Sequence, residues 1–193
     1  MKIFDVSVRG IAPLMQARHL TPAEEHAVTN RASSGKKKMK DFSDEEQMAL
    51  HSYKNKKGQY IQMSEMFEAA LVKAATSFKM EGKKSYKDVF KSGILIDPIE
   101  IVHESQKFTL DGRWGKNPNT GGAVWVVRPR IEQWSLSFEI QLLQDERVSN
   151  EILKEILEYA GIFVGVGSWR PKYGRFEVTK FAERVEKKSK SKK

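Results

Sequence analysis

The sequence predicts an α+β fold of the ferredoxin-like type, in which two helices cover one face of an antiparallel sheet. Stretches of alternating apolar and polar residues, typical of half-buried strands, stand near both ends of the chain. Two segments with apolar residues at helical spacing lie between such stretches. When two insertions are set aside, the order of elements is β-α-β-β-α-β. RNA-recognition modules have this same RRM-like order.

The first predicted strand covers residues 2–9, where apolar residues alternate with polar ones. Residues 14–19 are predicted to follow as a loop or a short turn of helix. The composition changes here, and residues at about 12–58 are expected to form a partly helical, lysine-rich insertion after the first strand. Within this insertion, residues 43–46 have the Ser-x-x-Glu pattern of a capping box, which predicts a helix start.

The first core helix is predicted to begin at Ser64, which we expect to cap it after an extended segment at residues 59–63. The apolar residues of its buried face are Met66, Phe67, Ala70, Leu71, Ala74, Ala75 and Phe78. A second strand region is predicted at residues 89–102. Pro98 interrupts this region and cannot donate to a sheet ladder, so the strand is expected to be bent or to lie at an edge.

An inserted β-hairpin is predicted at about residues 107–128, with residues 113–120 as a long exposed loop between its arms. Residues 134–142 alternate and predict another strand, and residues 149–160 have the spacing of an amphipathic helix. A glycine-rich turn at residues 161–175 leads into the last strand. Its glycines would let the backbone approach a ligand closely, or they form an ordinary connection with surface arginines.

The charge favours a polyanionic partner. The chain of 193 residues has a formal net charge of +9, and five lysines stand in its last seven residues. We expect one domain at residues 1–186 and a disordered basic tail at residues 187–193. The chain has no cysteine, which excludes disulfides and thiolate metal sites. A signal-peptide pattern and a membrane-spanning apolar run are both missing, which favours a soluble cytoplasmic protein with no membrane partner.

Basic and aromatic residues in the predicted loops and strand ends form the candidate nucleic-acid-binding set. Together they would track a single-stranded backbone with cations and stack bases on aromatic faces. The alternative is that the two tryptophans cover the core and that the lysines only solvate a loop. The members of the set are Arg113, Trp114, Lys116, Arg128, Arg130, Trp169, Arg170, Lys172, Tyr173 and Arg175, with Lys36, Lys37 and Lys38 in the insertion.

Catalytic candidates are few. His19 and His26 follow the first strand, where a histidine could act as a general acid or base, but no tyrosine, serine or lysine is spaced beside them. The alternative is that both are ordinary surface histidines. No group of His, Asp and Glu residues has metal-ligand spacing, so we expect neither a metal nor a cofactor. Asp111 precedes a glycine, as turn residues often do.

Three segments resemble proteins of the RAMP superfamily, the repeat-associated proteins of CRISPR systems. The first is the glycine-rich turn and the start of the following strand, residues 165–176, directly after the second core helix. The second is the extended segment at Tyr60-Ile61 with the small-residue-rich helix at residues 64–73. The third is Arg128-Pro-Arg130 with the strand at residues 134–138. Together these segments are similar to the ferredoxin-like domains from which that superfamily is built.

The resemblance implies a non-enzymatic protein that binds single-stranded RNA or DNA. Its partners would be further copies, in an oligomer or a filament along the strand, or other CRISPR-type subunits. Two alternatives stay open. One is a metal-independent endoribonuclease of the repeat-processing type, with His19 or His26 as the acid or base. The other is a phage-encoded, protein-binding scaffold or inhibitor that mimics a CRISPR subunit. By the same resemblance, Asp111 would imitate the metal-binding aspartate of target-cleaving backbone subunits.

Overall fold

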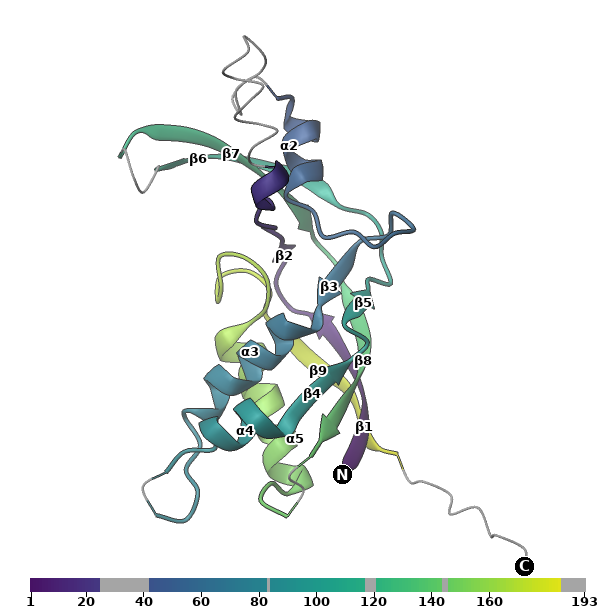
Figure 1. The fold of residues 1–193 in the computed structure, drawn as a ribbon, viewed down its shortest axis with the longest axis vertical. Helices are drawn as coiled ribbons and strands as arrows, with labels where there is room; N and C mark the ends of the chain where they lie inside the picture. Colours follow the sequence, from purple (N-terminus) through teal and green to yellow (C-terminus); the bar gives the residue numbers. More distant parts are fainter. Residues whose placement is uncertain (25–41, 83, 117–120, 144–145, 185–193) are drawn as a thin grey trace, which may run out of the picture.

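The computed structural model describes residues 1–24, 42–82, 84–116, 121–143 and 146–184, which form an elongated molecule (Figure 1). Its lower part contains a four-stranded antiparallel sheet in the order β4-β8-β1-β9. The strands are β4 (Ile94–Asp97), β8 (Ser135–Leu142), β1 (Lys2–Gly10) and β9 (Phe176–Glu183). The first strand of the chain thus lies between the third and fourth core strands, as in a ferredoxin-like fold, and the predicted fold class is confirmed.

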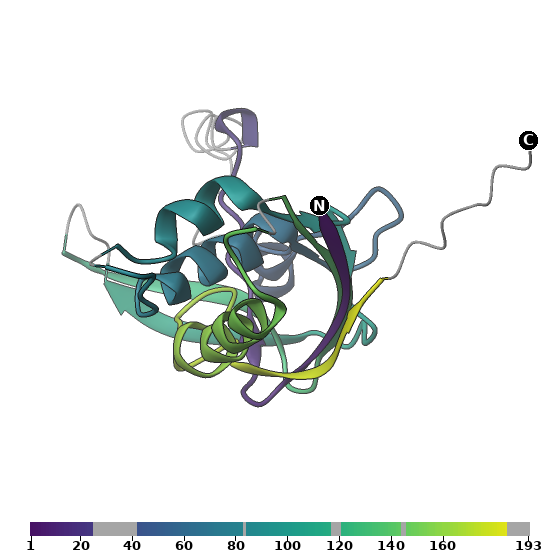
Figure 2. The ribbon, with the colours of Figure 1, turned by 90° about the horizontal axis from the view of Figure 1, so that it is seen from below.

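Three helices cover one face of this sheet, and the other face is open (Figure 2). They are α3 (Ser64–Ala75), α4 (Lys87–Gly93) and α5 (Asn150–Tyr159). The core lies between the two layers, where Phe4, Phe67, Leu71 and Ile140 are fully buried. Each such side chain stabilises the fold by about 1.5–3 kcal/mol relative to an exposed one. The predicted stripe of α3 is mostly confirmed, although Met66 and Phe78 are only half-buried.

A second, three-stranded sheet extends the molecule beyond the end of β1 (Figure 1). It contains β2 (Leu14–Met15), β7 (Ala123–Ile131) and β6 (Thr109–Lys116), and the last two form the predicted hairpin. Helix α2 (Asp44–Leu50) packs on this hairpin, where the indole N–H of Trp125 donates to Asp44 Oδ1 at 2.9 Å. The predicted capping box between Ser43 and Glu46 starts α2.

Four predicted details are wrong. Residues 14–15 are a strand, not a loop or a helical turn, because they pair with β7. Ser64 does not cap α3: Met63 occupies the N-cap position, and the Ser64 N–H donates to the Ile99 carbonyl. Val89 and Phe90 lie in α4 rather than in a strand, since they are buried together with Gly93 at helical spacing. Residues 113–116 continue β6 instead of forming a loop.

Pro98 separates β4 from β5 (Glu100–Val102), which pairs with β3 (Ile61–Met63) in a small two-stranded sheet. β4 lies at the edge of the main sheet, as its proline predicts. Helix α5 continues into a π-helical turn, η2 (Ala160–Val164), where the Gly165 N–H donates to the Ala160 carbonyl at 2.8 Å. This turn leads directly into the glycine-rich segment.

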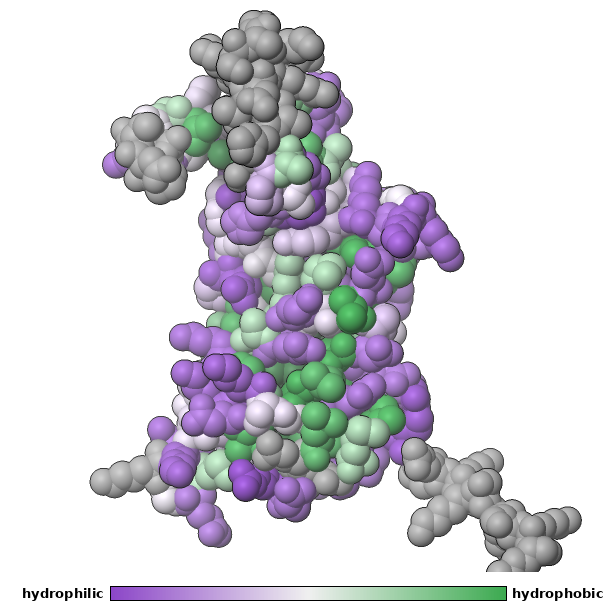
Figure 3. All heavy atoms as spheres, viewed as in Figure 1, coloured by the Kyte–Doolittle hydropathy of each residue, from purple (hydrophilic) through white to green (hydrophobic). Residues whose placement is uncertain are grey.

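Several predictions lie outside the described residues: His26, Lys36, Lys37, Lys38 and the basic tail at residues 187–193. Within the described part of the chain, no helix has the length and apolar character needed to cross a membrane. Figure 3 shows that hydrophilic residues cover most of the face seen in Figure 1, with apolar residues in smaller patches between them.

Candidate nucleic-acid interface

The glycine-rich turn is shaped by glycines with positive φ angles. Gly165, Gly167 and Gly174 have φ values of 71°, 80° and 72°, which L side chains rarely adopt. A Cβ atom on Gly174 would lie 1.7 Å from the carbonyl oxygen of Val166, closer than any van der Waals contact. The glycines therefore let two parts of the chain's own backbone pass each other.

The turn is also fastened to the segment after β1. The Gly174 N–H donates to the Pro13 carbonyl at 2.8 Å, and the Ser168 N–H donates to the Met15 carbonyl at 2.7 Å. These amides are used inside the protein, so the glycines position the turn rather than bring its backbone to a ligand. The exposed side chains of Trp169 and Arg170 project from this anchored support.

Three arginines lie on the face of the hairpin that is turned toward the glycine-rich segment. In the register of β6 and β7, Asp111 stands opposite Arg128, while Arg113 and Arg130 occupy the neighbouring positions on the same face. This follows from the alternation of side chains along a strand, because every second residue shares a face. The hairpin and the turn together form the arginine–aromatic cluster: Asp111, Arg113, Arg128, Arg130, Ser168, Trp169 and Tyr173.

Asp111 is the centre of this cluster, with an exposed fraction of only 9%. Its carboxylate accepts two hydrogen bonds from Arg113, one of them at 2.7 Å, and one from Arg130 at 3.1 Å. The hydrogen bonds from Arg113, and after them the one from Arg130, lower the pKa of Asp111 below its usual value, although burial acts in the opposite direction. Asp111 therefore stays charged and fixes two arginines in place.

Aromatic rings complete the cluster. The guanidinium carbons of Arg128 and Arg113 lie 4.6 Å and 5.2 Å from the centre of the Trp169 ring, which is within range of a cation–π interaction. Tyr173 is buried, and its hydroxyl accepts a hydrogen bond from Arg113 at 2.6 Å. Trp169 itself has a φ of 56°, a conformation that is costly for a residue other than glycine.

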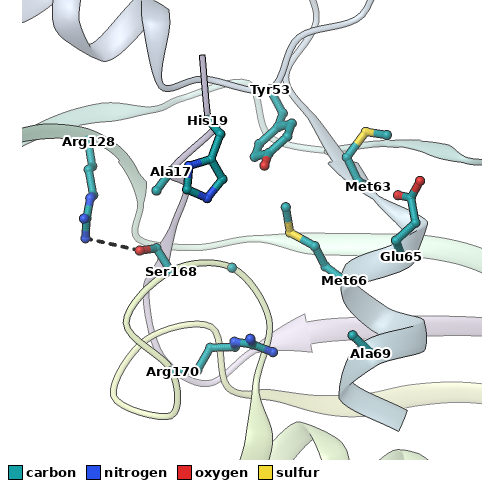
Figure 4. Close-up of a pocket in the computed structure, with 11 residues that line it drawn as sticks. Ala17, His19, Tyr53, Met63, Glu65, Met66, Ala69, Arg128, Ser168 and Arg170 are labelled. Carbon is teal, nitrogen blue, oxygen red and sulfur yellow. Dashed lines mark hydrogen bonds between the residues drawn. The ribbon is translucent and has the colours of Figure 1, made fainter. Parts of the chain in front are cut away.

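A cleft of about 540 Å³ opens beside the cluster (Figure 4). The glycine-rich turn, α3 and the segment after β2 form its walls. Arg128, which donates to Ser168 Oγ at 3.2 Å, and Arg170 contribute positive charge, and Glu65 contributes the one carboxylate of the described lining. The lining residues are Ala17, His19, Tyr53, Met63, Glu65, Met66, Ala69, Arg128, Gly167, Ser168 and Arg170.

The cations of this cleft are available to a ligand. Among the described residues, neither Arg128 nor Arg170 forms an ion pair with a carboxylate, whereas Arg113 and Arg130 are both bound to Asp111. Partial burial lowers the pKa of Arg128, which reflects the cost of holding its charge away from water. An anion bound in the cleft would offset this cost.

The predicted binding set is only partly brought together. Arg113, Arg128, Arg130, Trp169 and Tyr173 meet in the cluster, and Arg170 faces the adjoining cleft. The prediction that the whole set lies in loops or at strand ends is wrong, because the three hairpin arginines lie within strands.

Four members of the set lie apart from the cluster. Trp114 and Lys116 point to the opposite face of β6, because they stand one and three positions after Arg113 and alternate residues share a face. Trp114 is 72% exposed and packs against Trp125 with ring centres 5.5 Å apart, so it is not a lid over the core. Lys172 is exposed on the turn. Arg175 is half-buried, and its carbonyl accepts the N–H groups of Ile11 and Ala12.

Sequence reasoning missed the acid at the centre of the cluster and most of the cleft. Asp111 was expected to be a turn residue, but it lies in the middle of a paired strand and binds arginines. The alternation of Asp111 and Arg113 in a strand would have placed both on one face. Tyr53, Met63 and Met66 carry no pattern that indicates a cleft, since Met63 and Met66 stand at the start of α3 and Tyr53 comes from a separate segment.

Among the described residues, no three His, Cys, Asp or Glu side chains lie close enough together to hold a metal ion. Asp111 is engaged with two arginines rather than with further carboxylates. His19 is exposed and lines the cleft, so of the two catalytic candidates it is the one that lies within the described site.

No protein-family model and no curated protein matches the sequence. The fold is similar to a chain in a cryo-EM structure of the Type III-B Cmr-beta bound to cognate target RNA, with a TM-score of 0.58 at 9% sequence identity. The similarity covers 94% of this chain and 60% of that chain, so the present protein spans about three fifths of its structural neighbour. At this level of sequence identity the likeness shows a shared fold and no more.

Proposed function

We propose that the protein binds single-stranded RNA in the cleft beside the arginine–aromatic cluster. The observation that carries this proposal is the pair Arg128 and Arg170, which line the cleft next to the exposed ring of Trp169 and have no carboxylate partner among the described residues. Guanidinium groups that form no ion pair with a carboxylate can bind phosphates with forked donors, and an exposed indole offers a face to a base.

The chemistry of the cleft suits a single strand better than a duplex. Stacking on Trp169 requires an unstacked base, which loops and single strands provide and paired helices do not. The choice of RNA over DNA rests on the fold, because the structural neighbour is a chain of a complex that is bound to target RNA. By the same analogy, the protein would work beside other CRISPR-type subunits or assemble along the strand with further copies of itself.

The proposal can be tested by fluorescence anisotropy with labelled single-stranded RNA and DNA of equal length, at about 50 mM and 200 mM salt. The full chain is compared with a variant in which Lys187, Lys188, Lys190, Lys192 and Lys193 are changed to serine. This comparison separates binding by the folded part from nonspecific attraction by the tail.

Arg128→Ala and Arg170→Ala are each expected to weaken binding about tenfold, the loss for one charge-assisted phosphate contact of about 1.4 kcal/mol. Arg147→Ala is the matched control: Arg147 is an exposed arginine between β8 and α5, on the side where Leu142 pairs with Lys2. The cleft lies beyond the opposite end of β1. Equal losses for all three variants would contradict binding in the cleft.

Affinity that does not change with salt would contradict the proposal, because phosphate neutralisation releases counterions and makes binding salt-dependent. Failure of every nucleic acid to bind would favour the alternative of a protein-binding scaffold or inhibitor. The fold assignment does not depend on either result.

A second candidate function follows from the position of His19 in the same cleft. An imidazole beside a bound RNA strand could serve as general acid or base for cleavage without a metal. The test is incubation of RNA with the protein in the presence of a chelator. Cleavage that is lost in His19→Ala, while RNA affinity is kept, would support this function, and intact RNA would end it.

A further inference from the structure

An exposed aromatic ring stands beyond the cleft, on the π-helical turn η2. Phe163 has an exposed fraction of 60%, although a phenylalanine is among the residues most often buried. Its ring packs on Tyr159 with the ring centres 4.6 Å apart, and Tyr159 packs in turn on Phe78 with the centres 5.5 Å apart. The ring is therefore braced on one side and open to solvent on the other.

The surface in front of Phe163 is hollowed and basic. A second depression of about 380 Å³ is lined by Ala69, Lys73, Phe163, Val164, Arg170 and Pro171. Two of these residues, Ala69 and Arg170, also line the cleft described above. In Figure 4 the side chain of Arg170 reaches from the glycine-rich turn toward α3, which carries Ala69. Arg170 thus stands between two adjoining hollows.

The charges around this second depression are positive. Lys73 and Arg170 contribute the only ionisable groups of its described lining, and neither forms an ion pair within the described parts of the chain. The carboxylate that enters the first cleft, Glu65, does not line the second. A braced ring flanked by two free cations matches what a nucleotide requires, a stacking face for the base and cations for the phosphates.

We propose that Phe163 is a base-stacking platform for the single strand, and that Arg170 and Lys73 bind the phosphates on either side of the stacked base. The strand would then run from Arg128 through Arg170 to Phe163, along the edge between the glycine-rich turn and α3. This inference rests on the proposed function, and it adds a second site of base contact to the one at Trp169.

The first test compares the RNA affinity of Phe163→Ala, Phe163→Leu and Ile162→Ala in the full chain. Ile162 is the matched control because it is 46% exposed on the same turn but lines neither hollow. Both Phe163 variants are expected to bind about 5-fold to 100-fold more weakly, the range for loss of one stacked base. Leucine should not rescue binding, since it keeps the apolar surface but has no aromatic face.

The second test is photo-cross-linking with RNA that carries 4-thiouridine, followed by mass spectrometry of the linked peptide. A cross-link to the peptide containing Phe163 supports the stacking platform. Unchanged affinity of both Phe163 variants, while Arg128→Ala binds weakly, would overturn this inference and leave the proposed function standing. Absence of binding by the unsubstituted protein would overturn both, so the two failures are distinguishable.

Discussion

The open face of the four-stranded sheet and the arginine–aromatic cluster contain the same kinds of charged residue in opposite situations. On the sheet face, Arg184 binds Asp5 at 2.5 Å and Glu139 at 2.6 Å, and Arg9 binds Glu177 at 2.6 Å. These pairs are exposed, and their charges satisfy one another. In the cluster and its cleft, arginines outnumber the carboxylates that contact them, and the rings of Trp169 and Tyr173 lie against several of them.

The side chains on the open sheet face of this protein differ from those with which RNA-recognition modules bind RNA. Those modules stack bases on aromatic residues of the open sheet face. Here the outward positions of β1 and β8 carry Asp5, Ser7, Ser137 and Glu139 instead. A shared order of strands therefore does not imply a shared binding face, and the site must be found from its side chains.

The largest effect is expected from Gly174→Ala, which tests whether the cluster depends on the close passage of two backbones. The added Cβ would clash with Val166 and force an unfavourable φ, so the free energy of unfolding should fall by about 4 kcal/mol. Urea denaturation measures it. Gly58→Ala is the control, because Gly58 has a φ of 77° but no atom within 4 Å of the added Cβ. It should lose only about 1 kcal/mol.

His103 lies in neither region, but it makes the free energy of unfolding of the whole protein depend on pH. The effects of substitutions in both regions must be compared against this dependence. It is buried, and burial lowers its pKa to about 4 from 6.5. Between these values the unfolded chain binds more protons than the folded one, so stability is lost as the pH falls from 6.5 toward 4. We expect a loss of about 3 kcal/mol over this range. His103→Leu should remove this dependence, and an unchanged profile would contradict the assignment.

Asp111→Asn is expected to cost about 2 kcal/mol near neutral pH, since it weakens charge-assisted hydrogen bonds to two partly buried arginines. The folded pKa of Asp111 is lowered, so its stabilisation is present above the usual value of 3.8 and is lost as the pH falls below it. The difference between the variant and the unsubstituted protein should therefore shrink below about pH 4.

The matched control for this change is Asp5→Asn, on the open sheet face. Asp5 also contacts two cations, Arg184 and Lys180, but its side chain is 36% exposed. Its effect on unfolding should be clearly smaller than that of Asp111→Asn, because water screens exposed ion pairs. Equal losses at the two positions would remove the distinction between the two regions.

Trp169→Gly separates binding from stability within the cluster. The substitution relieves a positive φ but removes the ring that lies beside Arg113 and Arg128, and these contributions oppose each other at about 1 kcal/mol each. The denaturation midpoint should therefore change little, while RNA affinity falls about tenfold through loss of a stacking face. A large loss of stability with unchanged affinity would identify Trp169 as a structural residue.

The sequence was sufficient for the main sheet because its strands and helices are regular. Alternation in β1 and β8 and helical spacing in α3 and α5 placed these elements with small errors. The short elements were missed: α4 has seven residues and β2 has two, too few for periodicity to decide. The sequence predicts a loop at residues 113–120, but cross-strand pairing with β7 makes residues 113–116 a strand.

The candidate site was harder to predict than the fold, because contacts between distant segments create it. Arg113 and Tyr173 are 60 positions apart and share a hydrogen bond that no local pattern indicates. Residue type suggested arginines and aromatics as the candidate set, but it could not tell which face of β6 each side chain occupies. The candidate set therefore includes Trp114, although Trp114 lies on the opposite face of the hairpin from Arg113, Arg128 and Arg130.

The smallest effect is expected from Arg184→Ala, which tests whether an arginine of the open sheet face contributes to stability or to RNA binding. Arg184 bridges Asp5 and Glu139, but its side chain is 44% exposed, so the energy of its ion pairs is largely screened. The denaturation midpoint should stay within experimental error, and RNA affinity should change less than about twofold, because long-range attraction is weak at physiological salt. A loss of affinity as large as that of Arg128→Ala would mean that the strand crosses the open sheet face. In that case the acidic residues of the sheet face would contact the RNA phosphates through a bridging cation instead of repelling them.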